Sequence, residues 1–287
     1  MGGSLILGFF DGVHVAHRAV IGSALAYSGS NATLITFKDS PTIYLNNRYG
    51  NCGIKEYVLS RKESIRRIKN LGVKNIVELD FSEIANMTAE NYLDYIVSQY
   101  SPDAIFTGFN HTFGHNKSGN SDFLSKNQTK YGYKYFCISP QKVENEIVSS
   151  TIIKQYLKDG NIEKANSMLG ENFILEGIVK KGAQVGRTIG FPTANISYSK
   201  DIVKIPFGVY KAVYDGKDAI VNWGMRPTVH NIKEPVVEIH ILNFDNDLYG
   251  KNIRVEIVKR IREEKRFSNL DELKIQIEKD IQKCTEL

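Results

Sequence analysis

The pattern of strands and helices changes once along this 287-residue chain, near Gly170, and that change constrains the fold more than any other feature. Before Gly170, short apolar runs alternate with amphipathic helical segments, which predicts a parallel, Rossmann-like sheet. The predicted strands are Leu5–Leu7, Thr33–Phe37, Ile76–Leu79, Ala104–Thr107 and Tyr133–Ile138. The predicted helices are Arg18–Tyr27, Ser60–Leu71, Thr88–Val97, Thr151–Lys158 and Ile162–Met168.

After Gly170, strand-like runs follow one another, separated by turn signals such as Asp215-Gly216 and Asn246-Asp247. These runs are Phe173–Val179, Val209–Tyr214, Ala219–Trp223, Val236–Leu242 and Ile253–Val258. The pattern predicts a β-barrel, finished by a helix from about Leu270 to Lys283. Because the chain exceeds the usual domain size of about 100–150 residues, we expect two domains, 1–170 and 171–287.

Composition excludes several classes of protein. The net charge is +5, but the basic residues form no block or stripe, which argues against a nucleic-acid partner. No apolar stretch approaches the roughly 20 residues of a membrane span. The three cysteines, Cys52, Cys137 and Cys284, are odd in number and far apart, which is typical of reduced thiols in the cytoplasm. We expect small-molecule partners only, and a monomer or weak homo-oligomer.

The first candidate site is the segment GFFDGVHVAH, residues 8–17, between the first predicted strand and helix. Ligands bind at the carboxyl ends of parallel strands, and anions favour helix N-termini. His14 and His17 fit three interpretations: an ordinary surface turn, a metal pair, or a nucleotide site whose imidazoles and backbone N–H groups face a triphosphate. A metal pair lacks a third ligand with useful spacing.

A second segment favours the nucleotide interpretation. Ser149, Ser150 and Thr151 begin a helix that follows the last predicted strand of the sheet, and Lys154 lies one turn further on. Hydroxyl groups at a helix start, with a cation nearby, suit an anion, although Ser and Thr are also ordinary helix caps.

Together these segments resemble the (T/H)xGH and SSTxIR motifs of the nucleotidyltransferase superfamily, and Gly108–Gly114 looks like the flavin-side loop of that family. The resemblance implies ATP or phosphate contacts from one set of residues and a flavin contact from Asn110. That set is Gly8, Phe10, Asp11, Gly12, Ser149, Ser150, Thr151 and Lys154.

The second half carries a more specific pattern. Residues 182–195, GAQVGRTIGFPTAN, closely resemble the GRxxGFPTAN signature of riboflavin kinases, and WGMRPT, EIH and LYGK follow in that family's order. Arg262, Glu264 and Phe267 match its RxExxF segment. The whole chain is therefore similar to the bacterial bifunctional riboflavin kinases/FMN adenylyltransferases. The resemblance implies a Rossmann-like nucleotidyltransferase domain followed by a six-stranded barrel.

For the kinase step, the resemblance assigns the general base to Glu238, on the same strand face as Val236 and His240. The same resemblance implies that Thr193 and Asn195 supply neutral oxygens for Mg²⁺ and phosphate, and that Gly182, Gly186 and Arg187 belong to the phosphate loop. It also implies that Arg262 and Phe267 contact the flavin. The expected substrates and products are riboflavin, FMN, FAD and ATP.

The adenylyl transfer needs no general base, because the attacking FMN phosphate is already ionised. It needs cations and donors, which His14, His17, Lys154 and Mg²⁺ would supply. Ala16 stands where the family has Gly, and Lys154 where it has Arg. A kinase whose first domain is impaired is therefore the alternative, and a non-catalytic flavin sensor is a third hypothesis.

Overall fold

The structure is a computed structural model that describes all residues except 1–2, 49, 51–55, 181–188, 226–234 and 287. Its contacts divide the chain into two compact units. The first comprises residues 1–55 and 61–150, and the second comprises 56–60 and 151–287. The predicted class, a parallel sheet followed by a six-stranded barrel, is confirmed. The change of contacts falls at Ser150/Thr151, whereas the predicted domain boundary stands at 170.

The first unit is built on five parallel strands in the order β3-β2-β1-β4-β5. Chain order reverses between β1 and β4, so the loops after these two strands begin on either side of a crevice where ligands commonly bind. The strands are β1 Ser4–Leu7, β2 Thr33–Phe37, β3 Asn75–Leu79, β4 Ala104–Gly108 and β5 Lys134–Ile138. Each lies within one residue of its predicted bounds.

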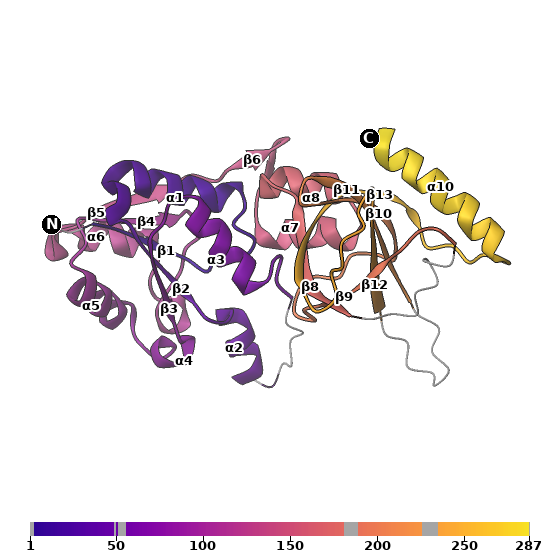
Figure 1. Ribbon diagram of the computed structural model, residues 1–287. Coiled ribbons are helices and arrows are strands. Elements are labelled where there is room, and N and C mark those ends of the chain that lie inside the picture. Colours follow the sequence, from indigo (N-terminus) through magenta and orange to yellow (C-terminus); the bar gives the residue numbers. More distant parts are fainter. Residues whose placement is uncertain (1–2, 49, 51–55, 181–188, 226–234, 287) are drawn as a thin grey trace. The chain divides into compact units, whose positions relative to one another are not determined.

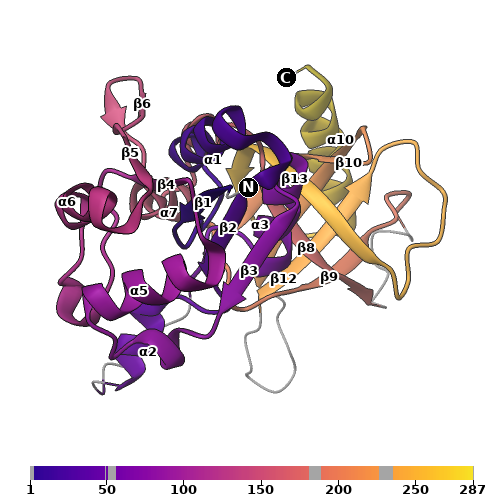
Figure 2. The ribbon, with the colours of Figure 1, turned by 90° about the vertical axis from the view of Figure 1, so that its left-hand side faces the viewer.

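Helices cover both faces of this sheet (Figure 2). One apolar cluster joins Ile6 and Leu34 to residues of α1 and α3, and the other joins Leu5 and Ile35 to residues of α5 and α6. The helices are α1 Val15–Ser28, α2 Pro41–Arg48, α3 Arg61–Asn70, α4 Phe81–Ile84, α5 Ala89–Tyr100 and α6 Ser121–Tyr131. Short 3-10 turns lie at Gly29–Asn31 and His115–Lys117, and a hairpin pairs β6 Lys142–Val143 with β7 Glu146–Ile147.

The second unit is a closed barrel in the strand order β10-β11-β12-β9-β8-β13. Its strands are β8 Phe173–Lys180, β9 Ala194–Tyr198, β10 Gly208–Tyr214, β11 Lys217–Met225, β12 Pro235–Ile241 and β13 Asn252–Glu263. Helices α7 Ser150–Lys158 and α8 Ile162–Leu169 precede it, and α10 Leu270–Glu286 lies along its outside (Figure 1). No helix of the described residues is long and apolar enough to cross a membrane.

The barrel interior is filled by large side chains that alternate along each strand. Tyr210, Trp223, Val237 and Ile239 are all at most 1% exposed. Because successive side chains of a strand point to opposite faces, Glu238 lies on the outer face of the barrel. Glu238 and the side chains beside it therefore lie outside the lumen, on the face covered by α10.

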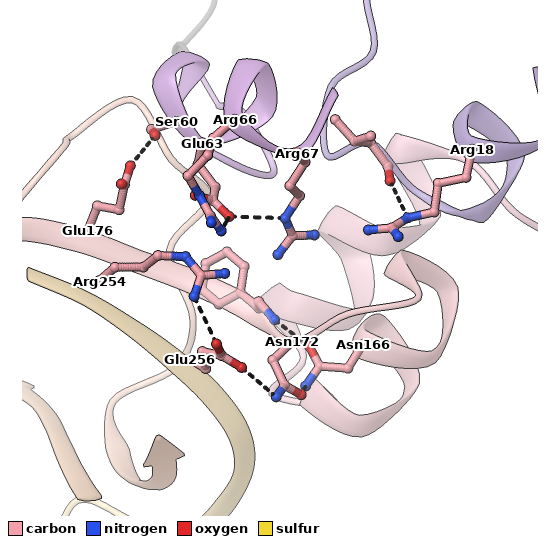
Figure 3. A network of polar contacts seen from close by, with 12 residues as sticks. Arg18, Ser60, Glu63, Arg66, Arg67, Asn166, Asn172, Glu176, Arg254 and Glu256 are labelled. Carbon is pink, nitrogen blue, oxygen red and sulfur yellow. Dashed lines mark hydrogen bonds and ion pairs between the residues drawn. The ribbon is translucent and has the colours of Figure 1, made fainter. Parts of the chain in front are cut away.

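Polar contacts tie the elements of the second unit together (Figure 3). The amide of Asn166 on α8 donates to the carbonyl of Ile257 at 2.9 Å, and the amide of Asn172 donates to Glu256 at 3.1 Å. Ser60 donates to Glu176 on β8 at 2.6 Å. Its neighbour Tyr57 forms a parallel bridge with Ile202, so residues 56–60 add a short strand-like segment to this unit.

Candidate functional site

A cavity of about 370 Å³ lies between the outer face of the barrel and α10. β10, β11 and β12 supply one wall, and Leu273 and Ile277 of α10 face it. The other apolar lining residues include Ile189, Phe191, Val209 and Phe267. The polar lining residues are Thr193, Asn222, Glu238, His240, Arg262, Glu264, Lys265 and Asp280. A mostly apolar cleft with a few converging polar groups is typical of a small-molecule site.

Glu238 stands in the middle of a polar row across the outer face. On neighbouring strands it is paired with Asn195 of β9 and Asn222 of β11. Because directly paired residues project to the same face, the three side chains lie side by side. Glu238 is partly exposed in the cavity. The carboxylate is therefore accessible to a ligand, and two amides flank it.

A second cavity, of about 500 Å³, lies beside the first, and Thr193 lines both of them. Its wall includes Pro192, Ala194, and Ile239 of β12. The loop that follows β12 closes it with Phe244, Asp245, Asn246, Asp247, Leu248 and Tyr249. Two ligands could thus occupy separate cavities and meet at Thr193.

Thr193 and Asn195 carry the kind of atoms that hold Mg²⁺. Mg²⁺ prefers oxygen ligands and is usually bound by one or two protein groups together with substrate phosphates and water. The Thr193 hydroxyl and the Asn195 amide are oxygen donors, and the Glu238 carboxylate is paired with Asn195 across the strands. The described residues hold no cluster of three or more His, Cys, Asp or Glu side chains suited to a metal. The donor set therefore fits an ion shared with a nucleotide phosphate.

Arg262, a predicted flavin contact, is bound to α10. Its Nε lies 3.0 Å from each carboxylate oxygen of Asp280, and its Nη2 lies 2.8 Å from Oδ2. Asp280 is buried, at 2% exposed. The Arg262 guanidinium also lies 5.8 Å from the ring centroid of Phe267, the other predicted flavin contact. Arg262 therefore joins β13 to α10 through an ion pair whose two residues both line the cavity.

In the first unit, the loop from β1 to α1 has an unusual backbone. Phe10, Gly12 and Val13 have φ of 59°, 85° and 48°. Phe10 is buried, and a Cβ at Gly8 would lie 2.9 Å from its ring, so Gly8 makes room for Phe10. Positive φ at residues other than glycine is uncommon and is often found at ligand sites.

His14 and His17 lie together at the start of α1. His14 is the N-cap, and its Nδ1 accepts a hydrogen bond from the His17 backbone N–H at 3.3 Å. The two rings stack with centroids 3.6 Å apart, and Phe10 packs edge-on against His17 at 5.1 Å. The sequence predicted that the first helix begins at Arg18, but it already begins at Val15, so His17 belongs to its first turn.

Burial disfavours the protonated form of both histidines. It lowers the pKa of His14 to about 4, and it lowers the pKa of His17 well below 6.5 with a further contribution from His14. The Nδ1 of His17 is buried and has no hydrogen-bond partner among the described residues. In the free protein both histidines therefore offer neutral ring nitrogens, and their contact with a nucleotide phosphate stays a prediction.

Ser150 at the start of α7 lies against the same loop. Its hydroxyl donates to the carbonyl oxygen of Asp11 at 2.9 Å, so this contact fixes the loop backbone. Asp11 is itself buried, at 7% exposed. Ser149 precedes this position, and Thr151 and Lys154 follow in α7.

The loop after β4 carries the predicted flavin contact Asn110. Asn110 is exposed, and its side-chain oxygen would lie 3.6 Å from a Cβ built at Gly108. The next residue, His111, stacks on Phe113 at 5.7 Å, and burial lowers its pKa to about 4. His111 belongs to the loop 108–114 that the sequence indicated, and its side chain is half-buried.

The sequence did not connect Thr36 and Arg61 with the loop that follows β1. The Thr36 hydroxyl donates to the carbonyl of Phe9 at 3.1 Å, and Arg61 Nη2 donates to that hydroxyl at 3.3 Å. Thr36 of β2 and Arg61 of α3 thus fix the loop that follows β1. Contacts between residues so far apart in the sequence cannot be predicted from a local pattern. Three predicted phosphate contacts, Gly182, Gly186 and Arg187, lie outside the described residues.

Comparisons with known proteins agree with both halves of the structure. Residues 2–152 match the family model for FAD synthetase, and residues 169–287 match that for riboflavin kinase. The chain is 32% identical to the bifunctional riboflavin kinase/FMN adenylyltransferase of Bacillus subtilis, over 98% of this chain and 90% of that protein. It is 32% identical to the protein of the same name from Escherichia coli K12, over 96% of this chain and 90% of that protein.

A crystal structure from Streptococcus pneumoniae, titled a macrolide-efflux protein, has the same fold over the whole chain. Its TM-score is 0.87 at 28% identity, and the match covers 100% of this chain and 94% of that chain. The fold and both matched models define a two-domain protein of flavin nucleotide synthesis. The chain belongs to the family of bifunctional riboflavin kinases/FMN adenylyltransferases.

Proposed function

We propose that this chain makes FMN from riboflavin and ATP, and then FAD and pyrophosphate from FMN and a second ATP. One observation carries the kinase assignment: Thr193 lines two cavities, and one of them also holds Glu238. The cavity with apolar and aromatic walls suits the flavin ring, and the other suits the nucleotide. The family membership supports both activities.

In the kinase step, Glu238 accepts the proton of the riboflavin 5′-hydroxyl while that oxygen attacks the γ-phosphorus of ATP. The bond to the ADP oxygen breaks, and ADP leaves. When bound at Thr193 and Asn195, Mg²⁺ would neutralise phosphate charge. Positioning then supplies most of the acceleration, and we assign it to the cavity walls, to Arg262 and Phe267 on the flavin side, and to Gly182, Gly186 and Arg187 at the phosphates.

In the adenylyl step, an oxygen of the FMN phosphate attacks the α-phosphorus of ATP, and pyrophosphate leaves. The attacking oxygen carries no proton at neutral pH, so no base is required. We assign to neutral His14 and His17, to the backbone of residues 8–12 and to the first turn of α7 the donors that stabilise the growing charge. Lys154 supplies a positive charge, and Asn110 contacts the flavin.

We further propose that residues 1–170 form the adenylyltransferase domain and 171–287 the kinase domain. The matched models, which end at 152 and start at 169, support a division in this region. Helices α7 and α8 lie between these points. We also propose a cytoplasmic protein, monomeric or weakly associated, that binds neither nucleic acid nor membranes.

The first test is to incubate the protein with riboflavin, ATP and Mg²⁺ and to separate the flavins by chromatography over time. FMN that appears and then gives way to FAD is the expected result. FMN that accumulates without FAD, even when FMN is supplied, would mean that Ala16 and Lys154 have silenced the first domain. No FMN would overturn the kinase assignment.

Glu238→Gln separates catalysis from binding. The amide keeps the shape of the side chain but accepts no proton, so we expect FMN formation to fall about 10²–10⁴-fold. Riboflavin binding, followed by quenching of its fluorescence, should change by less than about threefold, and adenylylation of added FMN should continue. Loss of binding together with activity would argue that Glu238 is structural. An unchanged rate would exclude it as the base.

A further inference from the structure

A second functional side chain stands two residues from Glu238 on the same face of β12. The Nδ1 atom of His240 lies 2.8 Å from the carbonyl oxygen of Pro192, and the ring packs edge-to-face against Phe191 at 5.7 Å. A carbonyl oxygen only accepts hydrogen bonds, so Nδ1 carries a hydrogen and donates it. This bond joins β12 to the segment before β9.

The hydrogen bond between His240 and Pro192 lies just beyond the last pair of the backbone ladder between β9 and β12. The last pair of that ladder is Ala194 with Ile239, so continuation of the register would place Thr193 opposite His240. Residues 191–193 belong to no strand. The side chain of His240 therefore holds this segment at a place where strand pairing no longer does.

Residues 191–194 are also the wall between the two cavities. Phe191 lines only the first cavity, Pro192 and Ala194 line only the second, and Thr193 lines both. His240 itself lines the first cavity, beside Glu238. A shift of this wall would move Thr193 relative to the base.

We infer that His240 is a positioning residue for the kinase step: its bond to Pro192 sets the place of Thr193 relative to Glu238. This inference rests on the proposed function. Glu238 and His240 lie two residues apart on the extended strand β12. The proposed base and the side chain that holds residues 191–194 therefore move together. In-line phosphoryl transfer is sensitive to such placement, because a shift of about 1 Å can lower a rate about 10²-fold.

The test compares three variants of the full-length protein, His240→Ala, His240→Asn and His240→Gln. The amide nitrogen of Asn takes nearly the place of Nδ1 and can donate to Pro192, whereas the longer Gln side chain places its amide further out. His115→Ala is the matched control, because His115 Nδ1 also lies near a carbonyl, that of Ala85 at 3.5 Å, but in the first unit. For each variant, kcat, KM for riboflavin and ATP, and the Mg²⁺ dependence of FMN formation are measured.

We expect His240→Ala to lower kcat about 30- to 100-fold and to raise the Mg²⁺ concentration needed for half-maximal rate, with the riboflavin Kd changed less than about threefold. His240→Asn should recover kcat to within about fivefold of the parent, and His240→Gln should not. A role in folding alone would reduce the number of riboflavin sites and leave the kcat per site unchanged.

Two results would overturn the inference: a kcat for His240→Ala within twofold of the parent, or His240→Asn no better than His240→Gln. The Asn and Gln pair decides the matter even if His240→Ala does not fold. If the parent protein itself forms no FMN, the proposed kinase function fails, which is a different outcome from an active parent that tolerates His240→Ala.

Discussion

At the scale of single residues, the first unit is marked by histidines whose charge is suppressed. Burial lowers the pKa of His14 and of His111 to about 4, and the pKa of His17 is also well below 6.5. In an unfolded chain these groups titrate near 6.5. The folded state therefore binds fewer protons than the unfolded state over the window between about pH 4 and 6.5.

This difference makes stability depend on pH with a definite sign. The histidines contribute nothing above about pH 7, where they are neutral in both states. As pH falls from 6.5 toward 4 they destabilise the folded state, by up to about 1.4 kcal/mol per histidine and pH unit. Urea titrations at several pH values, followed by circular dichroism, should show the loss. Fluorescence of Trp223, which lies in the second unit, follows that unit separately.

His111→Phe isolates one of the three groups. Phe keeps the stacking on Phe113 but cannot be protonated, so the dependence of stability on pH between 5 and 6.5 should become shallower. An identical slope in variant and parent would show that the pKa of His111 is not lowered in the folded protein.

At the scale of elements, α10 is held to the barrel by charge as well as by apolar contact. Arg262 binds Asp280, and Lys211 donates to the Cys284 carbonyl at 2.7 Å. Asp280→Ala would leave the guanidinium of Arg262 without its carboxylate, which costs about 3 kcal/mol for a largely buried pair. We expect a higher KM for riboflavin, because α10 walls the cavity, and a kcat within threefold of the parent. A lower kcat at unchanged KM would place Asp280 in the chemistry instead.

Strands β8 and β9 meet closely at Gly177. A Cβ at this position would lie 2.4 Å from the Ser197 carbonyl oxygen and 2.5 Å from Ile196 Cγ2, and backbone atoms of a closed barrel cannot retreat easily. Gly177→Ala should destabilise the second unit by about 1–3 kcal/mol and lower the urea concentration at which Trp223 fluorescence reports its unfolding. Gly22→Ala is the control, since nothing lies within 4 Å of its Cβ in α1. Equal stability of the two variants would contradict the close packing.

Much of the element pattern could be predicted, because buried strands and amphipathic helices have a local signature. Strand β9 could not be predicted, because Ala194–Tyr198 contains no apolar run. It is defined by its pairing with β8 and β12. Helices α2 and α6 were missed because polar residues dominate them. In the site, Glu238 and Thr193 were found through motif resemblance. The hydrogen bond of His240 to Pro192 and the lowered pKa of His14 could not be predicted from the sequence, because both depend on residues that folding brings together.

At the scale of the whole molecule, the second unit alone supplies the described residues of the kinase cavity. FMN made there should therefore be able to leave and be used by another copy of the protein. We expect a mixture of Glu238→Gln and His17→Ala proteins to form FAD from riboflavin much faster than either protein alone. Chromatography of the flavins over time measures this. A mixture that yields only FMN would mean that FMN does not pass between molecules.

The short segment 56–60 limits how the chain can be divided into two separate proteins. Its Tyr57 bridges Ile202 and its Ser60 binds Glu176, although the residues on both sides of the segment belong to the first unit. A single cut of the chain near residue 150 or 170 would thus yield a barrel without the segment 56–60, which belongs to the same unit. A kinase half produced by such a cut would lack the Tyr57–Ile202 bridge and the Ser60–Glu176 hydrogen bond.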